Sequence, residues 1–213
     1  MKDSNLRELE RLLTSARKAS GDSYAPDAVS QLVKYYAMVL KWNSRLHLTT
    51  ITEPAEFLSR HIFESSMVES LLPEPVRSVW DIGSGVGVPG IPVSIFRPDI
   101  HVHLVESNRA KSIFLDEVVY ALGLGNAEVH RARFESLDPP PVDSCVTARA
   151  VERMEKIIPK ILEFGSRSDR ILIFGNADLA LVLSGAHIEG RSLLTHPVPD
   201  CDNSLLVELT RST

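Results

Sequence analysis

Apolar residues recur at helical spacing through the first third of the chain. Two such sets predict two helices: Leu6, Leu9, Leu12 and Leu13, then Leu32, Tyr36, Val39 and Leu40. The polar break at 20–23 and Pro26 separate them, since proline suits the first turn of a helix. A shorter helix is expected from about Pro54 past His61. Residues 1–75 are therefore expected to form an N-terminal helical extension.

From residue 77 onward, short apolar runs alternate with helical stretches. The runs predict five strands, at 78–82, 102–105, 127–130, 145–148 and 170–174. The helical stretches lie at 89–96, 110–122, 151–164 and 177–183. This alternation is typical of parallel strands joined by right-handed crossovers, in a sheet with helices on both faces.

The end of the chain breaks this alternation. Two strand-like runs, 191–195 and 204–209, are separated by a segment with two prolines and no room for a helix. They are therefore expected to pair antiparallel. Residues 76–213 are predicted to form one α/β domain of Rossmann-like type, with a mostly parallel sheet and an antiparallel C-terminal strand. It is expected to pack with residues 1–75 as a single globular unit.

Composition narrows the class of protein. Of 213 residues, 44% are hydrophobic and 24% are charged, which is typical of a folded globular chain. A net charge of −5 argues against a protein that coats nucleic acid without specificity, yet allows a local basic patch. No apolar run approaches a membrane span, and the N-terminus lacks a signal-peptide pattern. A cytoplasmic protein, monomeric by default, is expected.

No metal site is expected from the sequence. Cys145 and Cys201 are the only cysteines, so they cannot form a disulfide framework and show no metal-ligand spacing. His101 and His103 share one face of a predicted strand and could bind a metal. No third ligand is evident beside them in the sequence, so surface exposure is the simpler interpretation.

The most informative segment is the glycine-rich loop after the first strand of the domain. Its four glycines are Gly83, Gly85, Gly87 and Gly90, and a helix follows. Glycine lets the backbone turn sharply and approach a ligand closely, and a helix N-terminus offers free amides. The next strand ends at Glu106, where a carboxylate can accept both hydroxyls of a ribose. This pattern predicts a nucleotide-like ligand.

Two ligands fit this loop. Gly85, Gly87 and Gly90 also spell the G-x-G-x-x-G fingerprint of dinucleotide-binding proteins, so an NAD-dependent oxidoreductase is one interpretation. Asp81, just before the first glycine, could instead hold the ammonium group of S-adenosylmethionine. The antiparallel ending also departs from a classical dinucleotide fold. The sequence therefore favours S-adenosylmethionine.

Candidate site residues follow from these positions. We assign the donor site to Asp81, Gly83, Ser84, Gly85, Gly87, Pro89, Gly90, Glu106, Phe134, Glu135 and Arg149. Phe134 could pack on the adenine or in the core. Arg149 follows a strand at the ligand-binding edge and could position the substrate base or a phosphate. A basic rim could be extended by Arg109, Lys111, Arg131, Arg133 and Arg153. His61 is expected to serve helix packing.

Six motifs stand in order along the chain: Trp42-Asn43 with Leu48-Thr49, residues 60–65, residues 81–90, Lys111 with Phe114-Leu115, Arg133-Phe134-Glu135, and Arg149-Ala150-Val151. They resemble the motifs of the glucose-inhibited division protein B family (RsmG), bacterial methyltransferases of 16S ribosomal RNA. The resemblance implies a class I methyltransferase fold and S-adenosylmethionine as the donor. It also implies that the acceptor is N7 of one guanine of 16S rRNA in the small ribosomal subunit.

Three positions depart from the family pattern. His47 stands where the family has Asn, Glu64 replaces Asp, and Phe174 stands in place of a Lys. A family member that binds its donor without catalysis is therefore an open alternative, as is a methyltransferase with a small-molecule or protein substrate. No catalytic triad is expected, because guanine N7 carries a lone pair and no proton. Alignment of the reactants would be the main requirement.

Overall fold

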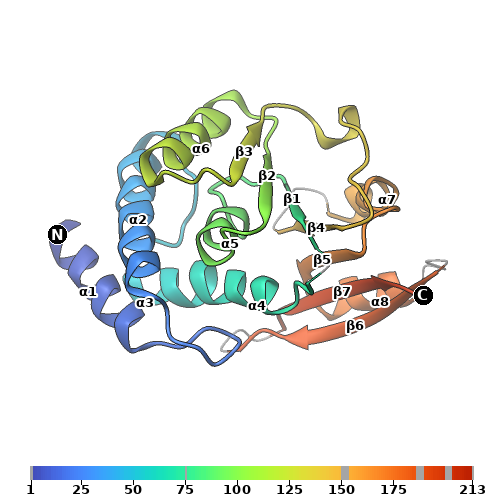
Figure 1. Ribbon diagram of the computed structural model, residues 1–213, viewed down its shortest axis with the longest axis horizontal. Coiled ribbons are helices and arrows are strands. Elements are labelled where there is room, and N and C mark those ends of the chain that lie inside the picture. Colours follow the sequence, from blue (N-terminus) through green and yellow to red (C-terminus); the bar gives the residue numbers. More distant parts are fainter. Residues whose placement is uncertain (1, 75, 150–153, 186–189, 200–202, 213) are drawn as a thin grey trace.

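The structure is a computed structural model, and it describes all residues except 1, 75, 150–153, 186–189, 200–202 and 213. Its seven strands are β1 (Ser78–Ile82), β2 (His101–Val105), β3 (Ala127–His130), β4 (Ser144–Ala148), β5 (Arg170–Gly175), β6 (Arg191–Pro197) and β7 (Leu205–Arg211). They form one sheet in the order β3-β2-β1-β4-β5-β7-β6 (Figure 1). Strands β1 to β5 pair in parallel, and β7 is antiparallel to both β5 and β6. The predicted mostly parallel sheet with an antiparallel ending is confirmed.

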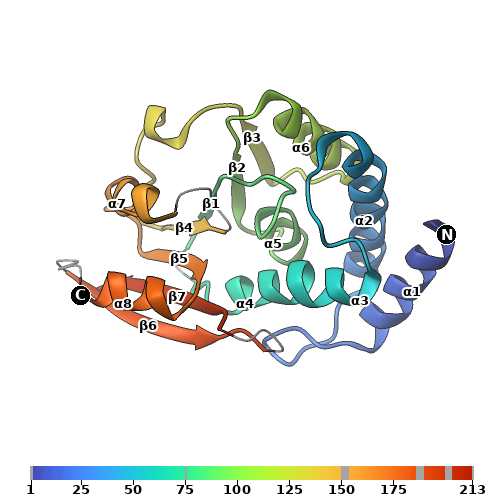
Figure 2. The same ribbon diagram turned by 180° about the vertical axis from the view of Figure 1, so that it is seen from behind.

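The helices cover both faces of this sheet (Figures 1 and 2). They are α1 (Lys2–Ser15), α2 (Pro26–Leu46), α3 (Pro54–Phe57), α4 (Glu64–Ser70), α5 (Gly90–Phe96), α6 (Arg109–Leu122), α7 (Met154–Phe164) and α8 (Ala177–Gly185). One buried apolar cluster joins α5 and α6 to the sheet, and a second joins α7 and α8 to the opposite face. The expected start of α7 at Val151 lies outside the described residues.

The helix expected near Pro54 is not continuous. Helix α3 runs into a π-helical turn at Leu58–Phe63, and α4 continues from it. π-helical turns are rare and occur often at functional sites. This turn carries Arg60 and His61, which both face the cavity described below.

The two C-terminal strands pair antiparallel, as expected from the sequence, but β7 lies inside the sheet and β6 at its edge. Leu206, Val207 and Leu209 of β7 are fully buried. Strand β6 alternates half-buried and exposed positions. An edge strand faces water on one side, so the strand with the denser apolar sequence takes the inner position.

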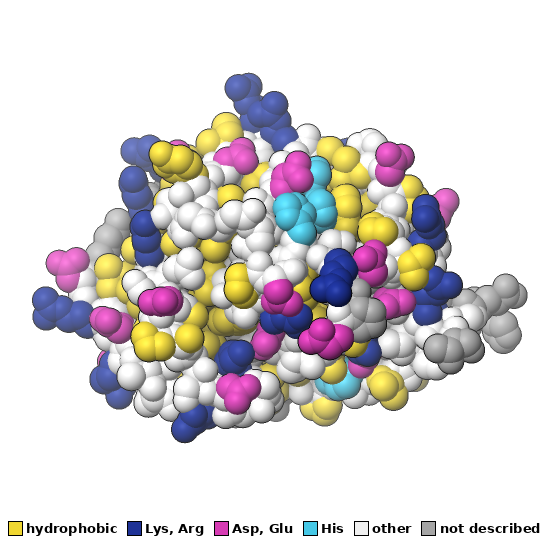
Figure 3. All heavy atoms as spheres, viewed as in Figure 1, with side chains coloured by type: hydrophobic (Ala, Val, Ile, Leu, Met, Phe, Trp, Pro, Cys, Tyr) yellow, Lys and Arg dark blue, Asp and Glu magenta, His cyan; other side chains and the backbone are white. Residues whose placement is uncertain are grey.

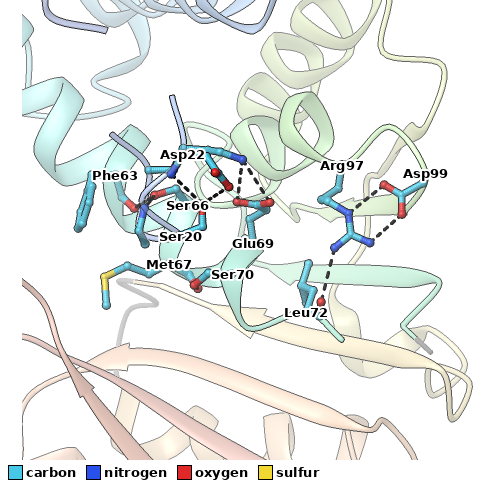
Figure 4. A network of polar contacts seen from close by, with 12 residues as sticks. Ser20, Asp22, Phe63, Ser66, Met67, Glu69, Ser70, Leu72, Arg97 and Asp99 are labelled. Carbon is cyan, nitrogen blue, oxygen red and sulfur yellow. Dashed lines mark hydrogen bonds and ion pairs between the residues drawn. The ribbon is translucent and has the colours of Figure 1, made fainter. Parts of the chain in front are cut away.

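The N-terminal helices share the main core with the sheet. One cluster of buried side chains extends from Leu9 of α1 through Tyr36 of α2 to Leu104 of β2. Polar contacts tie the segment after α1 to α4: Ala19 N donates to Ser66 Oγ at 2.9 Å, and Lys18 Nζ lies 3.3 Å from a Glu69 oxygen. Figure 4 shows Ser66 and Glu69, the two residues of α4 in these contacts. The division of the chain at residue 75 stays a prediction from sequence texture.

The pairing of β2 with β3 adds a neighbour to the two histidines. The sequence shows no third ligand beside His101 and His103, and the expected surface exposure holds for His101, whose side chain is 44% accessible. The parallel register sets Glu128 opposite His103, and the ligand atoms of all three lie within 4.8 Å of one another. A register between strands is a tertiary property, so the spacing within one strand could not reveal it.

Among the described residues, no helix is long and apolar enough to cross a membrane. Cys145 is a buried free thiol, and burial raises its pKa to about 12. This thiol is therefore protonated and unreactive near neutral pH. Cys201 lies outside the described residues.

Candidate functional site

The glycine loop turns at the carboxyl end of β1. Gly83, Gly85 and Gly87 have φ angles of 69°, 55° and 99°, in the left-handed region that favours glycine. The amides of Gly83 and Ser84 donate to Val105 O of β2, at 2.9 and 3.2 Å. These bonds fix the turn between two strands, at the edge of the sheet where α/β proteins bind their ligands.

Asp81 supports this loop through two hydrogen bonds of its buried carboxylate. Its Oδ2 accepts a hydrogen bond from Gly90 N, and its Oδ1 accepts one from Thr147 Oγ1, both at 3.2 Å. The residue is only 1% exposed, and burial raises the pKa of its carboxyl to about 6. From the opposite side, Tyr35 Oη donates to Val86 O at 2.7 Å. These contacts hold the loop in place.

The glycines of the loop have different surroundings. A Cβ on Gly90 would overlap Leu104 Cδ2 and lie 2.9 Å from Asp81 Oδ2. A Cβ on Gly87 would lie 2.7 Å from Ile91 Cγ1. A Cβ on Gly85 would meet only Gly83 O, at 3.6 Å. Gly87 and Gly90 therefore permit close packing of α5, whereas the open space lies beside Gly85.

This difference gives a paired prediction. Gly90→Ala should lower the free energy of unfolding by about 1–3 kcal/mol, because the extra methyl overpacks the core. Gly85→Ala should lower it by about 1 kcal/mol, the penalty for an alanine in the left-handed region. Urea unfolding measures both. In a titration with S-adenosylhomocysteine, Gly85→Ala should lose the larger share of affinity. Unchanged affinity in Gly85→Ala would remove this glycine from the ligand site.

A cavity of about 900 Å³ opens beside the loop. Of the residues assigned from the sequence, it is lined by Gly83, Ser84, Gly85, Glu106, Phe134, Glu135 and Arg149. The structure does not bring four assigned residues to its wall: Asp81, Gly87, Pro89 and Gly90. Their role as direct ligands stays a prediction, and their observed role is to shape and brace the loop.

Glu106 lies on the cavity wall and is only 7% exposed. Its Oε2 accepts from Gly85 N at 3.0 Å, and its Oε1 accepts from Asn108 N at 2.7 Å. Each carboxylate oxygen has capacity for a further hydrogen bond. The side chain is thus held in one orientation, with acceptor capacity left for a ligand that donates two hydroxyls.

Phe134 belongs to both the cavity and the core. It begins a short 3-10 turn, lines the cavity and is 6% exposed. Its ring meets that of Phe164 edge to face, with the ring centroids 5.5 Å apart. The two roles considered for it are therefore compatible. Glu135 accepts from Lys160 Nζ at 3.0 Å, which orients its carboxylate at the rim.

Arg149 sits at the centre of a charged network. Its Nη2 lies 3.0 Å from Glu64 Oε2, and its Nη1 lies 3.1 Å from His61 Nδ1. Glu64 is 2% exposed, and its Oε1 lies 3.0 Å from Arg60 Nε. Burial lowers the pKa of Arg149 and raises that of Glu64, while their attraction opposes both shifts. The guanidinium also lies over the Phe174 ring, 5.7 Å from its centroid.

His61 links this network to the loop at 47–51. Burial, reinforced by the positive charge of Arg149, lowers the pKa of His61 to about 3, so its ring is neutral. Arginine only donates, so Nδ1 accepts and the proton sits on Nε2, where it donates to Thr49 Oγ1 at 3.1 Å. Thr49 Oγ1 also accepts from Ile51 N. His61 packs against Phe57, as expected for helix packing, but it also has a place in the site.

The 47–51 loop is a wall of the cavity that sequence reasoning missed. Asn43 closes it, because its side chain donates to Thr49 O at 2.8 Å and accepts from Thr49 N at 3.0 Å. His47 has a φ of 47°, a conformation in which Asn and His are both enriched. The change from Asn at this position is therefore conservative for the backbone. The motif of Trp42-Asn43 with Leu48-Thr49 was the signal that could have located this wall.

The cavity rim is basic although the chain is acidic overall. Four cationic side chains line it: Arg60, Lys111, Arg133 and Arg149. Arg109 and Arg131 are exposed but lie outside the cavity wall. Arg153 falls outside the described residues. Of the five residues that the sequence suggested for a basic rim, Lys111 and Arg133 therefore lie on the cavity wall. Arg60 and Arg149 lie there as well.

Solved structures with the same fold are methyltransferases. The chain resembles TrmK of M. capricolum in complex with S-adenosyl-homocysteine, with a TM-score of 0.56 at 15% identity over 71% of this chain and 70% of that one. The METTL16 MTase domain matches with a TM-score of 0.60 at 11% identity, over 99% of this chain and 90% of that one. At these identities the likeness shows the class I methyltransferase fold, as expected from the sequence.

Sequence relatives are closer. The Ribosomal RNA small subunit methyltransferase G of Xanthomonas campestris pv. campestris (strain B100) is 37% identical over 147 residues, which is 68% of each chain. The protein of the same name from Nitrosomonas eutropha is 35% identical over 61% of this chain and 59% of that one. The pattern of the GidB family, described as rRNA small subunit methyltransferase G, matches residues 28–179. That match spans well over half of the chain and includes the glycine loop, Glu106 and Arg149, so the chain belongs to the GidB family.

Proposed function

We propose that this protein transfers the methyl group of S-adenosylmethionine to N7 of a guanine in 16S ribosomal RNA of the small ribosomal subunit. One observation carries the proposal: a single cavity joins the Gly83–Gly85 turn and Glu106 to a rim of four cationic side chains. The first part suits a nucleoside donor, and the second suits a polyanionic acceptor. Membership of the GidB family supports the same pairing.

The cavity fits S-adenosylmethionine by chemistry and size. Its volume falls within the range of small-molecule sites, roughly 300–1,000 Å³. Glu106 offers two oriented acceptors for ribose hydroxyls, and Phe134 offers an apolar wall for the adenine. The absence of a side chain at Gly85 leaves room beside them. When bound, S-adenosylmethionine supplies an electrophilic sulfonium methyl group.

The residues of the chain then have to position the acceptor rather than remove a proton. Guanine N7 has a free lone pair, so methylation needs no general base. Arg149 presents guanidinium donors at the cavity wall, which could hold the guanine O6 or a flanking phosphate. Neutral His61 and buried Glu64 fix the direction of that guanidinium. Holding nucleophile and methyl group in line supplies most of the catalysis.

The open alternatives gain no support from the relatives. None of the described neighbours and no part of the family match points to a nicotinamide-dependent oxidoreductase. Phe174, which raised the possibility of a non-catalytic family member, has its ring beneath the Arg149 guanidinium. A cation over an aromatic face is attractive, whereas a lysine there would repel Arg149. The substitution therefore suits the network found here.

A transfer assay tests the proposal. The protein is incubated with methyl-labelled S-adenosylmethionine and small ribosomal subunits from a strain that lacks this modification, and the labelled base is mapped. Label at N7 of one 16S guanine is expected. Arg11→Met, which alters an exposed residue remote from the cavity, serves as the matched control and should transfer equally well. No label, with an active family enzyme on the same subunits, would overturn the proposal.

The proposed ribosomal substrate leads to expectations about the location and the oligomeric state of the protein. We expect it in the cytoplasm and as a monomer. Light scattering after gel filtration checks the monomer. A dimer in which activity falls on dilution would contradict the expectation.

A further inference from the structure

Three histidines and a glutamate gather on one face of the paired strands β2 and β3. His101 and His103 lie two residues apart on β2, and Glu128 and His130 lie two residues apart on β3. Side chains at this spacing share a face, and the parallel register sets His103 opposite Glu128. Figure 3 shows histidine side chains beside an acidic one on the surface of this face. The backbone alone therefore brings the four side chains together.

The ligand atoms lie close to the spacing of a metal site. Glu128 Oε2 is 3.6 Å from His101 Nε2 and 3.9 Å from both His103 Nδ1 and His130 Nε2. His103 Nδ1 and His130 Nε2 are 2.8 Å apart. In a tetrahedral zinc site with bonds of about 2.0–2.1 Å, neighbouring ligand atoms are about 3.3 Å apart. Shifts of about half an ångström would bring these four distances to that value, and the ligand atoms of His101, His103 and Glu128 all lie within 4.8 Å of one another.

The surroundings keep the ligands available. His103 is stacked on the Trp80 indole, with ring centroids 3.9 Å apart, and His130 stacks on the same ring at 5.5 Å. His101 and Glu128 are partly exposed, with side chains 44% and 57% accessible, so an ion can enter from solvent.

We propose that His101, His103, Glu128 and His130 form a binding site for one divalent transition-metal ion, with zinc as the natural occupant. Three imidazoles and a carboxylate are ligands that zinc prefers in a four-coordinate site. The ion takes the place of the hydrogen bond between His103 Nδ1 and His130 Nε2. The ring that donated this bond then carries its proton on its other nitrogen, so both imidazoles stay neutral. None of the four side chains lines the donor cavity, so the site is separate from the proposed transfer reaction.

The metal would link two strands just before they deliver residues to the cavity. Strand β2 leads into Glu106, and β3 leads into the segment that carries Arg133 and Phe134. A bridge between His103 and His130 would fix the separation of these strand ends. Its role is therefore structural, and it should raise the stability of the chain with the logarithm of the free ion concentration once that concentration exceeds the dissociation constant.

Metal titration tests the proposal. The chelator-treated protein is titrated with ZnCl₂ by calorimetry and with NiCl₂ by tryptophan fluorescence, since Trp80 stacks on two of the ligands and should be quenched. One ion per chain is expected. His103→Ala and Glu128→Gln should each weaken binding by more than about 100-fold, because loss of a supporting residue alone can cost that much. Thermal unfolding without metal shows that each variant is folded.

His196→Asn is the matched control. It removes a histidine that lies 2.7 Å from Glu208 on the β6–β7 pair, where a single imidazole faces a carboxylate. Its metal affinity should equal that of the parent chain. Absence of saturable binding in the parent, or equal affinity in His103→Ala, would overturn the proposal. Neither result would bear on methyl transfer, since none of the four side chains lines the donor cavity.

Discussion

Replacement of Arg149 by methionine is expected to lower the free energy of unfolding by about 3–5 kcal/mol, the range for breaking a buried ion pair. Glu64 is 2% exposed and lies 3.0 Å from the Arg149 guanidinium. Without that partner, its charge is held only by the partly exposed Arg60. Burial already raises the pKa of Glu64, so the unpaired carboxylate would be strongly disfavoured. Urea unfolding at neutral pH measures the loss.

A double-mutant cycle separates the ion pair from simple packing. Glu64→Gln together with Arg149→Met should recover part of the stability, because no charge is then left buried. Arg11→Met is the control: it breaks an exposed pair with Glu8 at a similar distance, 2.8 Å, and should cause no measurable change. If the double variant were as unstable as the sum of the two single variants, the pair would not be coupled.

Activity distinguishes the role of Arg149 in positioning from its role in stability. Arg149→Lys keeps the charge but offers one ammonium where the guanidinium contacts both His61 and Glu64. It should retain most of the stability and lose most of the methyl transfer to ribosomal subunits. Full activity in a folded Arg149→Lys variant would remove the arginine from the acceptor site.

Local sequence patterns were sufficient to predict the strands and the central residues of the candidate site. Strands 78–82 and 127–130 were placed at their observed bounds, because short apolar runs flanked by glycine or polar residues have few other solutions. Gly85 and Glu106 were placed on one ligand wall from their spacing, since a βα unit brings the end of one strand beside the end of the next. The family motifs added Arg149.

Long-range pairing could not be obtained in this way. The insertion of β7 between β5 and β6, the meeting of Glu64 with Arg149 and the grouping of Glu128 with His103 join residues distant in the sequence. The 47–51 wall was missed for a similar reason, because this loop lines the cavity beside residues that are distant in the sequence, such as Gly85 and Arg149. For Asp81 the structure adds two partners that its position in the sequence did not indicate, Gly90 N and Thr147 Oγ1, and the predicted contact with the donor stays a prediction.

Asp81 should make the stability of the protein fall as pH rises from about 4 to about 6. Burial raises the pKa of its carboxyl to about 6, above the ordinary value of 3.8. In that interval the folded state binds more protons than the unfolded state, so deprotonation favours unfolding. The shift corresponds to at most about 3 kcal/mol. Below pH 4 the stabilising effect is complete, and above pH 6 it is lost.

The variant Asp81→Asn isolates this contribution, because an amide resembles the protonated carboxyl and does not titrate. Its oxygen can accept from Gly90 N while its NH₂ group donates to Thr147 Oγ1, so the loop should keep its shape. Urea unfolding of both proteins between pH 4 and pH 7 gives the difference in stability, which should change by about 3 kcal/mol in favour of the variant. A difference that stays flat with pH would show that Asp81 titrates normally.

The Asp81→Asn variant also distinguishes two roles of Asp81: support of the glycine loop and direct contact with the methyl donor. If Asp81 only supports the glycine loop, Asp81→Asn should bind S-adenosylhomocysteine with nearly the parent affinity at pH 7. If the carboxylate instead pairs with the ammonium group of the ligand, the variant should lose affinity tenfold or more, about 1.4 kcal/mol per tenfold step. Bound ligand would then also lower the pKa of Asp81, and the stability of the parent complex would no longer fall between pH 4 and pH 6. The buried geometry, with both oxygens bonded to Gly90 and Thr147, favours the first outcome.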